Sequence, residues 1–193
     1  MNTKLITNLA ILAFGLIACG EQYQGAYSGQ AVLLQDSCGE SDVGFGLGQA
    51  NKEGMVDITV SMRKSGGGTE FLITEFKSLD GTLSPKTQTY IQGLRFNTEI
   101  FNDYEIRTTD AKYEIPEASR NKIMKNLNVD QLTDEDLEQL SYDEIDATGS
   151  ITADRKKIES LQVDIYSQQV SNSTLIPCQM SFSITSDGLT LNQ

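Results

Sequence analysis

The sequence predicts a mainly β protein, either an antiparallel β-sandwich or an up-and-down β-barrel of about 8–9 strands, with a short helical hairpin insertion near 116–142. Two observations lead to this fold class. Several short segments alternate apolar and polar side chains with a period of two, and turn residues separate these segments at short intervals. Both features are typical of half-buried antiparallel strands joined by tight connections.

Three segments show the alternation most clearly, namely 56–63, 161–166 and 179–185. In each of them every second side chain is apolar, which predicts a strand with one buried face. Less regular strands are expected over 29–35, 44–50, 70–77, 89–96 and 104–108. Turns are expected where glycine follows Asp or stands among other turn formers, at 51–54, 65–68, 80–81 and 187–188.

The segment 116–142 departs from the period of two. Pro116 suits the first turn of a helix, and apolar residues follow at helical spacing over 117–127. Thr133 is typical of a helix N-cap, with Asp136 three residues later in the place that Glu or Gln takes in a capping box. These signals predict two short helices between strands.

Composition limits the classes of function. The chain has 193 residues, a length expected of one domain. Its net charge of −12 argues against nucleic acid as a partner, because the phosphates would repel it. The sequence contains no histidine, which excludes a Ser-His-Asp or Cys-His nucleophile pair and a histidine-ligated metal within the chain. We therefore expect no catalytic residues, no cofactor and no metal site, and we do not expect an enzyme.

The N-terminal segment follows the plan of a secretory signal peptide. Lys4 supplies a positive charge, residues 5–17 are largely apolar, and small residues follow at 18–20. The apolar run is shorter than the about 20 residues that a membrane-spanning helix needs. The tetrapeptide Leu16-Ile17-Ala18-Cys19 resembles the lipobox of bacterial lipoproteins, in which the cysteine sulfur receives a diacylglycerol and the signal is cut before the cysteine.

This resemblance implies a signal peptide at 1–18, a lipidated Cys19 with a flexible tether over 19–28, and a single β-rich domain over 29–193. Two or more acyl chains make membrane attachment durable, so the membrane itself is an expected partner. Gly20 stands where the inner-membrane retention signal has aspartate. The resemblance therefore implies the outer membrane, with the domain facing the periplasm or the cell surface.

Two cysteines remain once Cys19 carries lipid. Exported proteins occupy compartments in which disulfides persist, and pairing Cys38 with Cys178 leaves no odd thiol. We therefore expect a disulfide that joins the first strand region to the start of the last one. On the chain-entropy model, closing a loop of this length stabilises the fold by roughly 5 kcal/mol at most.

The segment 130–146 contains eight acidic side chains and no basic one. One interpretation is a surface that binds a basic envelope or extracellular protein, and its candidate residues are Asp134, Glu135, Asp136 and Glu138. The other is a solvated helix face whose acids favour the helix N-terminus, neutralised by basic residues of the preceding helix. A calcium loop of the EF-hand type that starts at Asp134 does not fit. Its sixth position holds Gln139 where glycine is required, and its twelfth holds Ile145 where glutamate is required.

Three functions remain open at this point. The favoured one is a membrane-anchored envelope lipoprotein that serves as a protein-interaction or structural module. The alternative is a barrel that binds a small apolar ligand, with an architecture similar to that of the lipocalins. The least favoured is a hydrolase that uses two carboxylates as acid and base.

Overall fold

The computed structural model describes residues 25–38, 55–65, 68–78, 91–109, 112–115, 117–125, 127, 132–171 and 174–191. Several expectations fall outside these residues, namely the signal peptide, Cys19, the strand at 44–50 and the turns at 51–54 and 80–81. Within the described part of the chain the fold is almost entirely β, as the sequence predicts.

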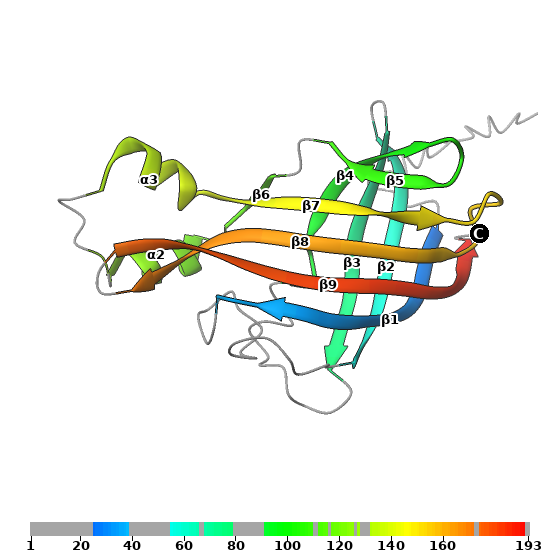
Figure 1. The fold of residues 1–193 in the computed structure, drawn as a ribbon, viewed down its shortest axis with the longest axis horizontal. Helices are drawn as coiled ribbons and strands as arrows, with labels where there is room; N and C mark the ends of the chain where they lie inside the picture. Colours follow the sequence, from blue (N-terminus) through cyan, green and yellow to red (C-terminus); the bar gives the residue numbers. More distant parts are fainter. Residues whose placement is uncertain are drawn as a thin grey trace, which may run out of the picture.

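Eight strands form a closed antiparallel barrel (Figure 1). They are β1 (Gly25–Asp36), β2 (Met55–Ser65), β3 (Gly68–Ser78), β4 (Arg95–Phe101), β5 (Glu105–Thr108), β7 (Tyr142–Ile151), β8 (Ile158–Ser171) and β9 (Thr174–Leu191). Each strand pairs with the next one in this order, and β9 returns to pair with β1 along eleven residue pairs. This last pairing closes the sheet, so the fold is the up-and-down barrel rather than the sandwich.

A short ninth strand, β6 (Lys112–Glu114), extends β5 along the same edge of β7. β5 pairs with 148–150 of β7, whereas β6 pairs with 142–144, so the two lie end to end. The helices α2 (Glu117–Lys125) and α3 (Asp134–Gln139) follow β6, which confirms the predicted helical insertion. In Figure 1 they lie at the left, where β7, β8 and β9 extend past the rest of the barrel.

Two strand boundaries differ from the prediction at the ends of the chain. β1 begins at Gly25 and not at residue 29, because Tyr27 is buried and pairs with Val60 on one side and Leu189 on the other. The predicted turn at 187–188 lies inside β9, where the register against β1 shifts by one residue between Ser28 and Gly29. A β-bulge therefore takes the place of the expected turn.

β7 is a strand that the sequence pattern does not predict, and its first residue, Tyr142, lies within the predicted helical insertion at 116–142. The inward positions of β7 include Asp143, which is fully buried, and this charged residue hides the period of two that Ile145, Ala147 and Ile151 would otherwise show. The strand expected over 89–96 is also wrong in part. Ile91 to Leu94 form a turn with Gly93 at φ 112°, and β4 starts at Arg95.

The described side chains that face the barrel interior are mostly apolar and buried. Buried apolar residues from all eight strands form one contiguous core. Its centre contains tilted aromatic pairs, with ring centroids 5.5 Å apart for Phe76 and Phe182 and 5.9 Å apart for Phe71 and Phe96. This packing replaces water with close apolar contact and supplies most of the driving force for folding.

Among the described glycines, Gly29 and Gly149 sit where a neighbouring backbone approaches most closely. A Cβ atom at Gly29 would lie 2.0 Å from the carbonyl oxygen of Thr185, and one at Gly149 would lie 2.0 Å from that of Ser160. Both glycines adjoin a register shift in the ladder. At both positions a side chain would not fit against the neighbouring strand.

One end of the barrel, here called the hairpin end, carries the β4–β5 turn at 101–105 and the β7–β8 turn at 152–157. Asn102 and Asp103 have positive φ, which matches the right-handed twist of the flanking strands. The two turns are joined, because the Ile151 amide donates to the Tyr104 carbonyl over 2.7 Å. The buried Tyr27 hydroxyl donates to the Arg155 carbonyl over 2.7 Å, which ties the start of β1 to the β7–β8 turn.

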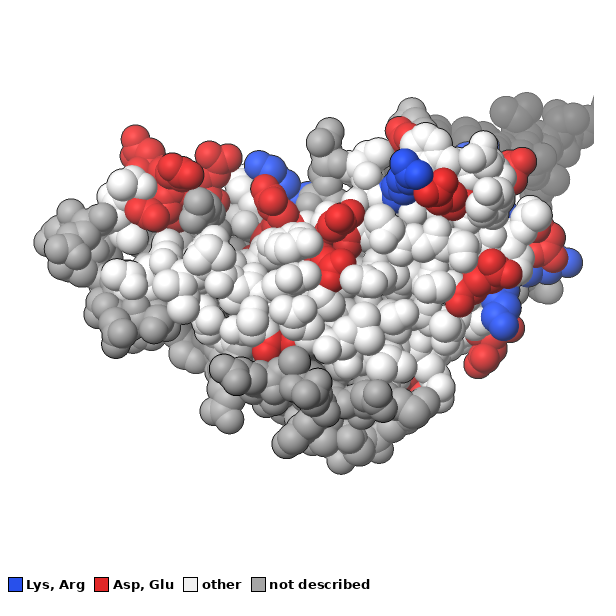
Figure 2. All heavy atoms as spheres, in the orientation of Figure 1, with Lys and Arg blue, Asp and Glu red and all other residues white. Residues whose placement is uncertain are grey.

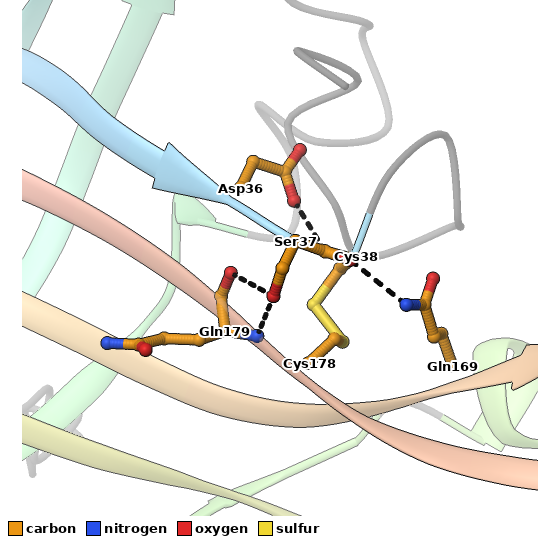
Figure 3. Close-up of a disulfide and its surroundings, with 6 residues drawn as sticks. All are labelled: Asp36, Ser37, Cys38, Gln169, Cys178 and Gln179. Atoms are coloured by element: carbon orange, nitrogen blue, oxygen red, sulfur yellow. Dashed lines mark hydrogen bonds between the residues drawn. A yellow bond between two sulfur atoms is a disulfide. The ribbon is translucent and has the colours of Figure 1, made fainter. Parts of the chain in front are cut away.

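The opposite end, here called the helix end, carries α2, α3 and the predicted disulfide. Cys38 and Cys178 are bonded with an S–S distance of 2.01 Å, which confirms their pairing. The adjoining Ser37 is fixed to β9 and β8 (Figure 3). The backbone amide of Gln179 donates to the Ser37 hydroxyl over 2.7 Å, and the side-chain Nε2 of Gln169 donates to the Ser37 carbonyl over 3.0 Å. The end of β1 is therefore held covalently and by hydrogen bonds.

Candidate functional site

A cleft of about 430 Å³ opens at the helix end. It is called the acidic cleft below. Its walls come from five elements, and the lining residues are Lys112 of β6, Glu135 and Glu138 of α3, Tyr142 and Glu144 of β7, Tyr166, Ser167 and Gln168 of β8, and Pro177 and Cys178 of β9. Segments far apart in the sequence therefore meet here because the barrel places their strands side by side.

The register of β7 against β8 gives the cleft its aromatic floor. Glu144 pairs with Tyr166, and Tyr142 stands two residues earlier on the same outward face. The side chains of Tyr142 and Tyr166 remain 44% and 43% exposed, which is unusual for large aromatic groups. Two accessible rings on adjacent strands provide flat surfaces that a ligand can contact.

The position of α3 is fixed by its two ends. At its start Thr133 and Asp136 form the capping box that the sequence predicts, with the Thr133 amide donating to the Asp136 carboxylate over 2.7 Å. At its end Leu140 is buried, and the Ile115 amide donates to the carbonyl of Ser141 over 3.0 Å. α3 therefore leads directly into β7, which brings Glu135 and Glu138 beside the cleft.

The cleft carries more negative than positive charge. Glu135, Glu138 and Glu144 contribute carboxylates, and Lys112 contributes the single ammonium group of the lining. The Lys112 Nζ lies 3.7 Å from a Glu138 carboxylate oxygen and 6.0 Å from the centre of the Tyr142 ring. Figure 2 shows acidic side chains gathered over α3 and again along β7, beside a broad uncharged area over β8 and β9.

The pKa values of Tyr166 and Asp136, in and beside the acidic cleft, are shifted from their ordinary values. Partial burial, followed by the negative charges of Asp164 and Asp146, raises the pKa of the Tyr166 hydroxyl above its ordinary value. The hydroxyl therefore stays protonated at neutral pH and remains a hydrogen-bond donor. Hydrogen bonds from the backbone and then the side chain of Thr133 lower the pKa of the Asp136 carboxyl, so this group stays negative.

The four predicted binding residues divide into two groups. Glu135 and Glu138 line the acidic cleft, whereas the Asp136 carboxylate is occupied by the N-cap of α3. Asp134 is exposed on the same helix outside the lining. Among the described residues, Glu138 of α3 forms an ion pair with Lys112 of β6. Neutralisation of α3 by the basic residues of the preceding helix stays a prediction.

Sequence reasoning missed Lys112, Tyr142, Glu144 and Tyr166 as site residues. Tyr166 was recognised only as part of an alternating strand, and β6 and β7 were not identified at all. A partial signal existed in Ile145, Ala147 and Ile151, which lie at inward positions of β7. The buried Asp143 interrupts this pattern between Tyr142 and Glu144.

A second hollow, of about 540 Å³, lies on the other side of the barrel over β2 and β3. It is lined by Thr59, Thr74, Glu75, Phe76, Lys77 and Gln92. The lining contains one acid, Glu75, and one base, Lys77, so their formal charges cancel. The Thr59 hydroxyl donates to the Glu75 carboxylate over 3.1 Å. The chemistry of this hollow is therefore less distinctive than that of the acidic cleft.

Among the described residues, no group of three or more cysteines and carboxylates is arranged to hold a metal ion. No helix in the same part of the chain has the length and apolar character needed to cross a bilayer. The fold and the cleft together define a closed, disulfide-bonded β-barrel with an acidic surface site at one end. Comparison with protein families, with characterised proteins and with solved structures finds no match.

Proposed function

We propose that the protein is a membrane-anchored envelope lipoprotein whose acidic cleft binds a basic segment of another protein. The anchor is supported by the lipobox-like sequence that ends at Cys19. The binding role is supported by one observation above all: the cleft combines three carboxylates with two half-exposed tyrosine rings. This combination suits a lysine or arginine side chain, which is attracted both by carboxylates and by the face of an aromatic ring.

Lys112 indicates where such a side chain would sit. Its ammonium group lies between a Glu138 carboxylate and the Tyr142 ring, so the geometry accepts a cation. The Lys112 and Glu138 side chains are 54% and 70% exposed, and exposed ion pairs contribute little, about 0–1 kcal/mol. A partner with several basic side chains can therefore displace Lys112 at small cost and neutralise the remaining carboxylates.

The alternative functions receive less support from the described residues. Among the described residues, the side chains that face the barrel interior, where a lipocalin-like protein would hold its ligand, are mostly buried aromatic and aliphatic groups packed in one cluster. The buried acids Asp36, Glu70 and Asp143 lie on three different strands, and Glu70 is paired with Arg63 over 3.0 Å. Glu70 is therefore held in an ion pair and is not available as one of the two carboxylates of a glycoside hydrolase.

The proposal is tested by photo-crosslinking in the envelope of a bacterium that exports the full chain. A photo-reactive phenylalanine derivative replaces Tyr142 or Tyr166 in the cleft, and in a control it replaces Leu34, which is exposed to a similar extent on β1. We expect a discrete crosslinked protein from both cleft positions and not from the control. Raising the salt concentration during crosslinking should weaken the product, because exposed charges are screened.

A charge-reversal experiment then distinguishes binding by the acidic cleft from attraction to the net negative charge of the whole protein. Glu135→Lys with Glu138→Lys should abolish the crosslink at Tyr142. The matched control, Glu75→Lys with Glu159→Lys, makes the same change in net charge at exposed positions outside the cleft lining and should leave the crosslink intact. Equal loss in both pairs would show that net charge alone is responsible, and the absence of any crosslink from the cleft would overturn the binding role.

A further inference from the structure

The start of β1 limits where the membrane can lie. Gly25 begins the strand at the hairpin end, and Tyr27, two residues later, is bonded to the Arg155 carbonyl of the β7–β8 turn. Six residue steps separate Gly25 from Cys19, and a fully extended chain spans at most about 3.6 Å per residue. A lipid attached at Cys19 therefore lies within about 20 Å of the hairpin end.

Two large aromatic side chains are exposed at this end. Phe101 is 40% exposed and Tyr104 is 51% exposed, and both belong to the β4–β5 turn. The turn is held firmly, since the Tyr104 amide donates to the Phe101 carbonyl over 3.0 Å and the Tyr104 carbonyl accepts from Ile151. The Arg107 guanidinium lies 5.4 Å from the centre of the Phe101 ring. Aromatic rings beside basic groups are typical of surfaces that contact the headgroup region of a bilayer.

Charge is distributed unevenly along the barrel. The hairpin-end turns, 101–107 and 152–157, carry four basic and three acidic side chains, a net charge of +1. At the helix end, 112–125 and 132–146 carry four basic and nine acidic side chains, a net charge of −5. Anionic lipid headgroups repel the helix end and tolerate the hairpin end. The charge distribution therefore favours the same orientation as the position of β1.

We infer that the barrel rests on the membrane through its hairpin-end surface, defined as Phe101, Tyr104, Arg107, Lys156 and Lys157, with the two aromatic rings among the lipid headgroups. The inference rests on the lipid anchor of the proposed function. The occupant of this surface is the bilayer that holds the anchor, because the short connection to Cys19 brings that bilayer against these residues.

This orientation explains why the acidic cleft stands at the opposite end. β7 runs from Tyr142 in the cleft to Ile151 beside Tyr104, and ten residues of strand extend about 30 Å. This length exceeds the screening length of about 8–10 Å at physiological salt. The cleft therefore points away from the membrane, where a basic partner meets it without competition from anionic lipids.

The chain contains no tryptophan, which allows a direct test. Tyr104→Trp places a single fluorophore in the hairpin-end surface, and Tyr142→Trp places one at the helix end with similar exposure. Each variant of the full chain is exported, purified and held on vesicles of phosphatidylethanolamine with a minority of phosphatidylglycerol. We expect membrane attachment to reduce acrylamide quenching of Trp at position 104 by about twofold and to leave position 142 unchanged.

The attachment itself is measured separately, so that its failure is distinguishable from failure of the orientation. Mass spectrometry of the purified chain reports the lipid at Cys19. If the sulfur is free, Cys19 is the single unpaired thiol, because Cys38 and Cys178 are bonded to each other, and it can be coupled to a maleimide lipid. Quenching that is equal at positions 104 and 142 on the vesicle, or shielding of position 142 alone, would overturn the inferred orientation whichever way the chain is attached.

Discussion

The buried hydroxyl of Tyr27 offers a quantitative test of how the hairpin end is built. Tyr27 is only 1% exposed, and its hydroxyl donates to the Arg155 carbonyl over 2.7 Å. Tyr27→Phe removes the donor and leaves that carbonyl without this hydrogen bond. We expect a loss of about 1 kcal/mol of unfolding free energy near pH 8, the usual value for one neutral hydrogen bond.

The same hydroxyl makes stability depend on pH. Burial raises the pKa of Tyr27 from 10 to about 12, so the folded protein retains this proton where the unfolded chain loses it. A group with a raised folded pKa contributes stability below its unfolded pKa, and that contribution falls as pH rises toward the folded pKa. Between pH 8 and pH 11 the wild type should lose about 1.4 kcal/mol from this group, and Tyr27→Phe should not.

The assay is urea unfolding of both proteins at pH 8, 9, 10 and 11, followed by circular dichroism. The other titrating groups are common to both proteins, so the difference between their unfolding free energies isolates Tyr27. We expect this difference to shrink from about 1 kcal/mol at pH 8 to zero or a small reversal at pH 11. Tyr104→Phe serves as the control for an exposed hydroxyl and should change stability near pH 8 by less than about 0.5 kcal/mol. A difference that stays constant across the range would refute the burial of this hydroxyl.

Three other changes test the barrel and its helix end. Gly149→Ala should destabilise the fold by about 2 kcal/mol or more in urea unfolding, because the new Cβ would meet the Ser160 backbone at 2.0 Å. Gly188→Ala is the control and should be nearly neutral, because no atom lies within 4 Å of its Cβ. Equal effects of the two substitutions would contradict the close approach at Gly149. Replacing Cys38 and Cys178 together by Ala should cost up to about 5 kcal/mol, given their separation of 140 residues, and reductant should then have no further effect on stability. Thr133→Ala should weaken the start of α3 by about 1 kcal/mol, seen as faster hydrogen exchange at the Asp136 amide, which donates to the Thr133 hydroxyl, while exchange in β8 stays unchanged.

The strands that the sequence located most clearly share one property. In β2, β8 and β9 the inward positions are apolar and the outward ones polar over several residues, so the alternation reports which face is buried. The capping box at Thr133 was predicted for a similar reason, because its two hydrogen bonds join residues only three positions apart. Patterns of this kind depend on neighbours in the sequence, and they can therefore be read without knowing the tertiary fold.

Other elements could not be found in this way because their surroundings come from distant segments. Asp143 is fully buried on β7, and a charged residue at an inward position contradicts the usual pattern of a strand. β6 has only three residues and is defined by its pairing with β7. Tyr142 and Tyr166 belong to one cleft because Glu144 pairs with Tyr166, a register that depends on the twist and stagger of the whole barrel.

Four features could be predicted from the amino-acid sequence: the mainly β class, the helical insertion, the Cys38–Cys178 bond and the acidity of α3. Each of these follows from residue type, local spacing or the parity of the cysteines. Three others become visible in the folded chain. β9 pairs with β1 to close a barrel, Glu135 and Glu138 are the two predicted acids that line the acidic cleft, and this cleft lies at the end opposite the start of β1. These outcomes depend on which strand edges meet and how the interior packs, and the energy of such contacts depends on residues that are far apart along the chain.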